Sequence, residues 1–189
     1  MQKRTIYIVI FFLAIIGIGG GIGIYYLLQA FNIQPAPEQD IITIYGPGVT
    51  DTYNMSMSDL QSNKYTQVTD QPFYTRLFNG SIALTGSYSG VSLRSILEEE
   101  SLLNLGAVNY TGIGGDGYNP GVIFGMLNIS NIMTNPYNLC IIAFGGTDFV
   151  PLDDGPLRLM INQSIVAPTI PSIRASRYCV SNLTAIFIA

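Results

Sequence analysis

The feature that most constrains this chain is a long, uncharged and strongly apolar segment near its N-terminus. It covers residues 5–31, which follow a basic start at residues 1–4, and no further charged residue occurs until Glu38. At 1.5 Å per residue, a helix of this length spans the roughly 30 Å hydrocarbon core of a bilayer. Because basic residues stay on the cytoplasmic side, we predict a single-pass anchor in the cell membrane with residues 1–4 in the cytoplasm and residues 32–189 outside it.

A cleaved secretory signal is the alternative interpretation of the same segment. The apolar region of a signal peptide is about 7 to 15 residues long and ends in a cleavage site of small residues. This segment is longer, and residues 25–31 (Tyr-Tyr-Leu-Leu-Gln-Ala-Phe) offer no good site, so we favour an uncleaved helix in contact with membrane lipid. Glycines between positions 17 and 23 form two G-x-x-x-G spacings. Such spacings favour a homodimer through the anchor, although glycine is common in membrane helices generally.

The rest of the chain is long enough for one folded domain. Residues 32–40 are polar, contain two prolines and are typical of a short stalk. Residues 41–189 then form an extracytoplasmic domain of about 150 residues, which is enough to bury a core. All twelve acidic residues follow the anchor, together with six of the eight basic ones. The domain is therefore acidic, we expect no basic cluster, and binding to nucleic acid, which needs Lys and Arg against phosphates, is not expected.

Acceptor patterns for N-glycosylation, N-x-[S/T], recur along the predicted outer part of the chain. They agree with an external glycoprotein surface, whereas a chain that is merely rich in Asn, Ser and Thr would carry them without being glycosylated. The candidate positions are Asn54, Asn79, Asn109, Asn128, Asn162 and Asn182.

The two cysteines, Cys140 and Cys179, both lie in apolar runs that are typical of strands. The inferred compartment permits oxidation, so a disulfide between them is one prediction, provided that their strands are neighbours. The alternative is a pair of free buried thiols that pack as small hydrophobic residues.

Strand signals outnumber helix signals in the domain. We expect a helix over residues 92–103 capped by Ser92, a helical turn at residues 57–60, and a hairpin in residues 74–85 that turns at Asn79-Gly80. No regular alternation of strands and helices demands a doubly wound sheet, so the predicted fold class is α+β with a mixed β-sheet. Further strands are expected at residues 41–45, 107–113, 139–144, 157–161 and 178–188.

The chain contains no histidine, and this excludes several kinds of active site. A Ser-His or Cys-His nucleophile pair cannot form, and zinc loses its commonest ligand. Residues 112–117 match G-x-G-x-x-G, but we expect no helix to open at residues 118–121 and hold a pyrophosphate. Asp148, Asp153 and Asp154 could offer oxygens to calcium, but loop aspartates more often cap turns, and no metal site is predicted.

Several segments, taken in order, resemble one family. They read Y-S-G-V-S-L-R-S-I-L, D-G-Y, L-C-I-I-A, P-L-D-D-G-P-L-R-L and Y-C-V-S-N-L-T-A-I, at residues 88–97, 116–118, 139–143, 151–159 and 178–186. This ordered set resembles the oxidoreductase molybdopterin-binding domain of the sulfite oxidase type, in a short stand-alone form that covers residues 41–188. The resemblance implies that fold, with one transmembrane helix preceding it.

The resemblance also implies a cofactor site. It places Tyr88, Asp116, Tyr118 and Arg158 at cofactor-binding positions, with molybdopterin as the cofactor. In the family, molybdenum is held by a cysteine thiolate that precedes the Y-x-G-V-x-L stretch, whereas this chain has no cysteine before Cys140. A soft thiolate is not replaced by Thr or Ser, and the missing histidines remove other contacts to a pterin.

The sequence therefore leads to a membrane-anchored binding or structural module, with no cofactor expected and an unidentified protein or small-molecule ligand. The first alternative is a molybdopterin-dependent oxidoreductase with an unusual ligand, and the second is a cell-surface structural protein. No catalytic residue is assigned. We also expect the Arg158 guanidinium to lie beside the acidic turn Asp153-Asp154 and to fix the start of its strand.

Overall fold

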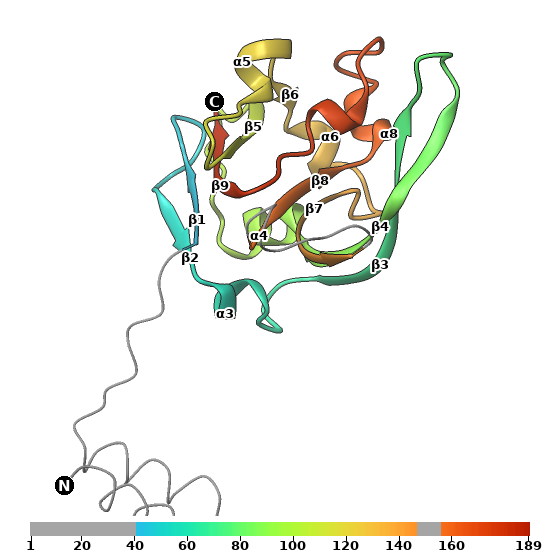
Figure 1. Cartoon of the computed structure of the whole chain (residues 1–189). Coiled ribbons are helices and arrows are strands. Elements are labelled where there is room, and N and C mark those ends of the chain that lie inside the picture. Colours follow the sequence, from blue (N-terminus) through green and yellow to red (C-terminus); the bar gives the residue numbers. More distant parts are fainter. Residues whose placement is uncertain (1–40, 147–155) are drawn as a thin grey trace, which may run out of the picture. The chain divides into compact units, whose positions relative to one another are not determined.

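The computed structural model describes residues 41–146 and 156–189 (Figure 1). Within these two ranges, no helix is long and apolar enough to cross a bilayer. The predicted anchor and stalk lie outside the described residues, as do the three aspartates at positions 148, 153 and 154. The predicted contact between Arg158 and the acidic turn therefore stays a prediction.

The first of two sheets is mixed. Its parallel pair joins the first and last strands of the domain, β1 and β9, with Ile44 opposite Ile186, and its other neighbouring strands are antiparallel. In spatial order its strands are β2 (Tyr53–Met55), β1 (Ile42–Tyr45), β9 (Leu183–Ile188), β5 (Asn109–Gly114) and β6 (Leu127–Asn128).

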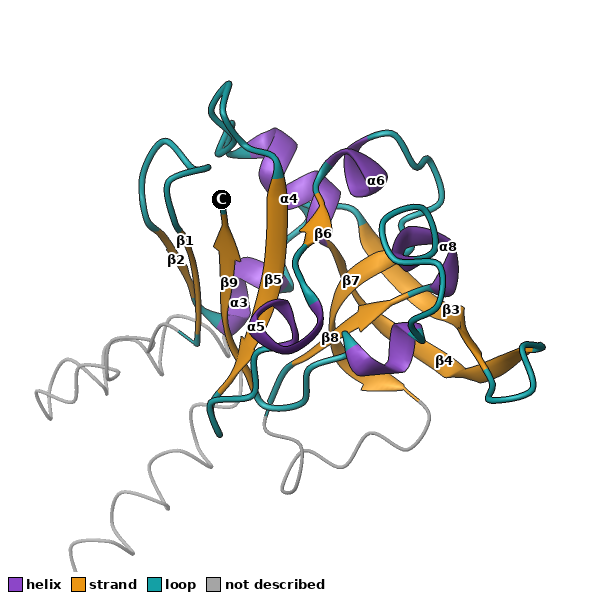
Figure 2. Ribbon diagram, turned by 90° about the horizontal axis from the view of Figure 1, so that it is seen from above, coloured by secondary structure: helices purple, strands orange, loops and turns teal. Residues whose placement is uncertain are grey.

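The second sheet is antiparallel throughout. Its strands, in spatial order, are β3 (Gln67–Arg76), β4 (Ile82–Ser92), β7 (Cys140–Gly146) and β8 (Arg158–Ile161). Figure 2 shows the two sheets as separate groups of strands, with the hairpin of β3 and β4 extending away from the rest. The predicted α+β class is confirmed, and the predicted mixed sheet is one of the two.

Short helices connect the strands. They are α3 (Met57–Leu60), α4 (Leu93–Glu99), α5 (Pro120–Phe124), α6 (Ser130–Met133), α8 (Gln163–Val166) and the 3₁₀ helix η1 (Ala175–Arg177). The predicted cap of α4 is present, because the Ser92 hydroxyl accepts a hydrogen bond from the Ser95 N–H. The helix ends earlier than expected. Ser101 adopts a φ of +51°, and the Leu102 N–H returns to the Leu97 carbonyl, which is how a chain turns out of a helix.

The expectation that no helix opens at residues 118–121 is wrong. Asn119 caps α5 by accepting from the Val122 N–H, and Pro120 takes the first helical position. Both residue types favour a helix start, since proline's missing N–H costs nothing there and its φ is already helical.

The main hydrophobic core draws on the inner faces of both sheets and on α4. Alternate residues of β7 and β8 divide between this core and a second cluster on the other face of the four-stranded sheet. We call this second set the outer cluster: Val68, Phe73, Tyr88, Ile141, Ala143 and Met160. Because both faces of β7 are buried, its sequence is a continuous apolar run instead of an alternating one.

Gly90 sets the distance between β4 and β7. A Cβ at this position would lie 2.2 Å from the Ile142 carbonyl oxygen and 2.7 Å from the Ala143 Cα. Such a contact is far inside van der Waals distance, and the obstacle is backbone, so a side chain cannot be accommodated without separating the strands.

We predict that Gly90→Ala lowers the free energy of unfolding by about 1 to 3 kcal/mol, the usual cost of overpacking a core. Gly145→Ala is the matched control on the facing strand, because nothing lies within 4 Å of a Cβ there. Urea unfolding followed by circular dichroism measures both. Equal midpoints for the two variants would contradict the close approach at Gly90.

Candidate functional site

The predicted cofactor positions fall in two places. Tyr88 and Arg158 lie on the outer-cluster face of the four-stranded sheet, whereas Asp116 and Tyr118 lie in the turn that follows β5. The two places are linked by residues 174–180, which lead from η1 toward β9.

Tyr88 is a buried residue of the outer cluster. Its ring meets the Phe73 ring edge to face, with 5.9 Å between centroids and 78° between planes. Arg158 is opposite Ala143 on β7, and Tyr88 is opposite Gly146 on the other side of the same strand. The structure therefore brings Tyr88 and Arg158 to one face but keeps the width of β7 between them.

The Asp-Gly-Tyr segment is a turn held by its own side chains. The Asp116 Oδ1 accepts from the Tyr118 N–H at 2.9 Å, and the Tyr118 hydroxyl donates to the Arg177 carbonyl at 2.6 Å. Burial raises the pKa of Tyr118, against the nearby Arg177 guanidinium, which lowers it. The hydroxyl therefore remains a proton donor near neutral pH and ties the end of β5 to η1.

Cys179 lies between the two places. Its thiol contacts the Ala175 and Ile161 carbonyl oxygens at 3.6 and 3.8 Å. Burial raises the pKa of Cys179 to about 11, although the hydrogen bond with Ile161 and the positive charge of Arg158 act in the opposite direction. Cys179 also influences the pKa of Tyr118. The segment around Cys179 is thus where the predicted residues come closest to forming one site.

The predicted disulfide is absent, since Cys140 and Cys179 are both free. The reason is the position of β8. Cys140 on β7 is opposite Ile161 on β8, and Leu159 of β8 bridges to Val180 on its other side. Two strand spacings give a Cα separation on the order of 9 to 10 Å, whereas a disulfide needs less than about 7 Å.

The two thiols also differ in their surroundings. Cys140 is fully buried in the main core, where the Tyr110 hydroxyl approaches its Sγ at 3.9 Å. Burial raises the pKa of Cys140 to about 12. Cys179 is partly exposed. Both thiols are therefore protonated near neutral pH, and Cys179 is the less buried residue of the two.

We predict that iodoacetamide at pH 9 modifies the native protein at Cys179 and leaves Cys140 untouched. After unfolding in urea without a reductant, both thiols should react, and intact mass should show two additions. Cys179→Ser is the control that assigns the native modification. A protein that gains no label in urea until a reductant is added would contradict the two free thiols.

The glycosylation candidates are not equivalent in the structure. Asn54 and Asn79 are exposed, and three others are partly buried: Asn109, Asn128 and Asn182. Asn162 is only 7% exposed, and its side chain caps α8 by accepting from the Ser164 N–H. A glycan at Asn162 does not fit the folded domain, because the position is used to start a helix.

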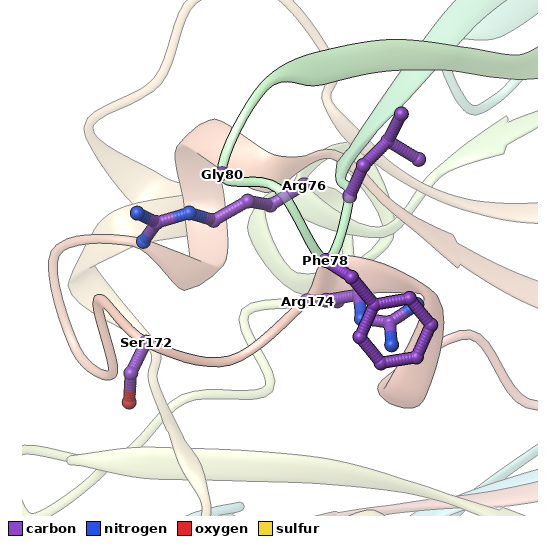
Figure 3. Close-up of a pocket in the computed structure, with 6 residues that line it drawn as sticks. Arg76, Phe78, Gly80, Ser172 and Arg174 are labelled. Atoms are coloured by element: carbon purple, nitrogen blue, oxygen red, sulfur yellow. The ribbon is translucent and has the colours of Figure 1, made fainter.

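A surface hollow of about 280 Å³ contains residues that the sequence did not bring together. It lies at the tip of the β3–β4 hairpin and is lined by Arg76, Leu77, Phe78, Gly80, Ser172 and Arg174 (Figure 3). The sequence predicted no basic cluster, yet two arginines almost 100 positions apart line this one hollow. Sequence spacing gives no signal for such a long-range meeting.

Gln163 is a further residue that sequence reasoning missed. Its Oε1 accepts from the backbone N–H groups of Arg76 at 2.9 Å and Ala175 at 2.8 Å, and its Nε2 donates to the Ile173 carbonyl at 2.9 Å. This buried amide holds the end of β3 to the segment that carries Arg174. Its only visible sequence signal was its place in an acceptor pattern for glycosylation.

Comparison with known proteins places the fold but not an activity. No family model matches this sequence, and no curated protein matches it. The structure is similar to that of the sulfane dehydrogenase SoxCD from Paracoccus pantotrophus, with a TM-score of 0.51 and 14% sequence identity. The similarity covers 82% of this chain and 39% of that chain, so this chain spans well under half of its length. At this identity the likeness concerns the fold alone, and it supports a sulfite oxidase-like, molybdopterin-binding type of fold.

Proposed function

We propose that this protein is a membrane-anchored, extracytoplasmic binding module that uses a molybdopterin-binding type of fold without holding molybdenum. The observation that carries the proposal is the place and state of its two thiols. Neither lies on β3, the strand that precedes and pairs with the Y-S-G-V-S-L strand β4. A metal-binding thiol must also be deprotonated, and burial opposes this at both Cys140 and Cys179.

The other donors give no better fit to the metal. The chain has no histidine. In the part of the chain that the structure describes, no three side chains from His, Cys, Asp and Glu gather as a metal site would require. Tyr88 is packed against Phe73, and the Asp116 carboxylate already holds its own turn. Three of the four residues that the resemblance places at cofactor positions, Tyr88, Asp116 and Tyr118, are thus engaged in contacts within the domain.

The distribution of charge supports a binding role toward anionic ligands. Residues 71–93 and 156–189 contain no Asp or Glu. The same two ranges hold Arg76, Arg158, Arg174 and Arg177, so guanidinium groups gather on elements that lack carboxylates. Arginine is the residue best suited to bidentate contacts with carboxylate or phosphate.

The test is metal and pterin analysis of the full chain. Produced in a host that makes molybdopterin and extracted in mild detergent, it should contain no stoichiometric molybdenum or tungsten. Cys179→Ser is the matched variant, and its metal content should equal that of the parent. One metal per chain, with fluorescent oxidised pterin after acid release, would overturn the proposal. It would instead favour the oxidoreductase alternative that the likeness to a dehydrogenase raises.

The membrane part of the proposal has its own test. The apolar residues 5–31 should keep the chain in the membrane pellet through high-salt and alkaline washing. External protease should leave a small N-terminal remnant. A soluble mature form that begins near Asn32 would show a cleaved signal peptide instead.

A further inference from the structure

The β3–β4 hairpin carries an exposed apolar surface that the proposed function does not use. We call it the hairpin patch: Tyr74, Leu77, Phe78, Ile82 and Leu84, each at least 40% exposed. The strand register puts Tyr74 opposite Leu84 and Arg76 opposite Ile82, so these four side chains share one face of the hairpin. Apolar side chains gathered on one projecting element, in contrast to single exposed ones, mark an interaction surface.

The tip of this hairpin is its most exposed part. Phe78 is 91% exposed, and the turn closes with a Gly80 N–H to Leu77 carbonyl bond of 3.0 Å. The predicted turn at Asn79-Gly80 is present within a connection of residues 77–81, in which Gly80 adopts a positive φ. The tip thereby presents two large apolar side chains, Leu77 and Phe78, in succession. Figure 1 shows the hairpin projecting beyond the body of the domain.

Positive charge borders the apolar tip. The Arg174 guanidinium lies against one face of the Phe78 ring, 3.2 Å from its centroid, and the Arg76 Nη1 donates to the Pro171 carbonyl at 2.7 Å. Figure 3 shows the Arg174 guanidinium at the Phe78 ring and the Arg76 side chain extending away from that ring. Residues 71–93 and 156–189, which carry this tip and both arginines, contain no Asp or Glu. An apolar tip flanked by arginines complements the boundary between lipid headgroups and acyl chains.

The outer edge of β3 is closed to a second copy of the sheet. Pro72 lacks an N–H, and register shifts interrupt the strand near Asp70 and Phe73. Near the tip, Gln163 accepts from the Arg76 N–H, and the Thr75 hydroxyl accepts from the Ser176 N–H. These features are how proteins protect an edge strand from pairing with another chain. The exposed surface therefore does not favour edge-to-edge dimerisation.

We propose that the hairpin patch docks on the surface of an anionic lipid bilayer. Leu77 and Phe78 enter the headgroup boundary, and Arg76 and Arg174 face lipid phosphates. This contact does not depend on whether the protein binds molybdenum, and its test measures only the contact with lipid. It also implies that Asn79, at the tip, carries no glycan in the docked protein, because a hydrated sugar chain would hold the tip away from the bilayer.

The chain contains no tryptophan, so a single introduced one reports its own surroundings. The probe is full-chain Phe78→Trp reconstituted into phosphatidylcholine vesicles with and without phosphatidylglycerol. With phosphatidylglycerol, its emission should shift to shorter wavelength and be quenched by lipids brominated near the headgroup. Adding Arg174→Gln should reduce this quenching, as should high salt.

Leu105→Trp is the matched control, since Leu105 is fully exposed and lies outside the hairpin. It should stay accessible to aqueous iodide in both kinds of vesicle, and so separates hairpin docking from mere tethering. Leu77→Trp is the second reporter, with circular dichroism to verify folding of each variant.

Three results would overturn the proposal. Iodide could quench Phe78→Trp and Leu105→Trp equally in both vesicles, which would mean a free hairpin. Brominated lipid could quench Phe78→Trp equally with and without phosphatidylglycerol, which would mean that docking does not depend on anionic lipid. Phe78→Trp could stay shielded from iodide in detergent and show no quenching by brominated lipid. This would mean that a second copy of the chain, and not lipid, covers the hairpin patch.

Discussion

The buried amide of Gln163 is the interaction on which the arrangement of the β3–β4 hairpin and the Arg174–Arg177 segment depends. It satisfies two backbone N–H groups and one carbonyl from segments that are remote in sequence, the end of β3 and residues 173–175. A buried amide with its partners in place stabilises modestly, but removing it would leave several backbone groups unpaired at a cost of about 1 to 3 kcal/mol each. The base of the hairpin and the Arg174–Arg177 segment are therefore held as one unit.

The motifs that carry the family resemblance are explained by the fold itself. Gly90 is needed because β7 backbone lies where its Cβ would be, and Ser92 is needed to start α4. Asp116 closes its turn, and the Tyr118 hydroxyl binds the Arg177 carbonyl. Each of these roles exists without a cofactor. A chain can keep such motifs for stability after losing the thiolate, which is why likeness of fold and likeness of chemistry must be argued separately.

Local signals in the sequence predicted local structure well. Ser92 caps its helix as expected, and Asn79-Gly80 lies in the turn of a hairpin, because both effects act within a few residues. Predictions that depended on which segments are neighbours in space were less successful. Cys140 begins β7 as expected, whereas Cys179 follows η1 outside any strand, because β9 begins only at Leu183. β8 also lies between the two cysteines. The meeting of Arg76 with Arg174 had no sequence signal either, since it is created by a β-hairpin and a distant loop coming together.

The two proposed membrane contacts are the predicted anchor and the hairpin patch. The hairpin patch is the weaker one, and its weakness suggests its role. Fully burying a Phe or Leu side chain stabilises by about 1.5 to 3 kcal/mol, and the tip would bury its two only in part, so a detached domain would bind a bilayer marginally. A chain held by the predicted anchor would instead present its hairpin at a high effective concentration, because residues 32–40 extend at most about 30 Å. A weak patch would then suffice to fix how the domain lies on the membrane. An orientation fixed in this way would also decide which way the Cys179 segment and its arginines face.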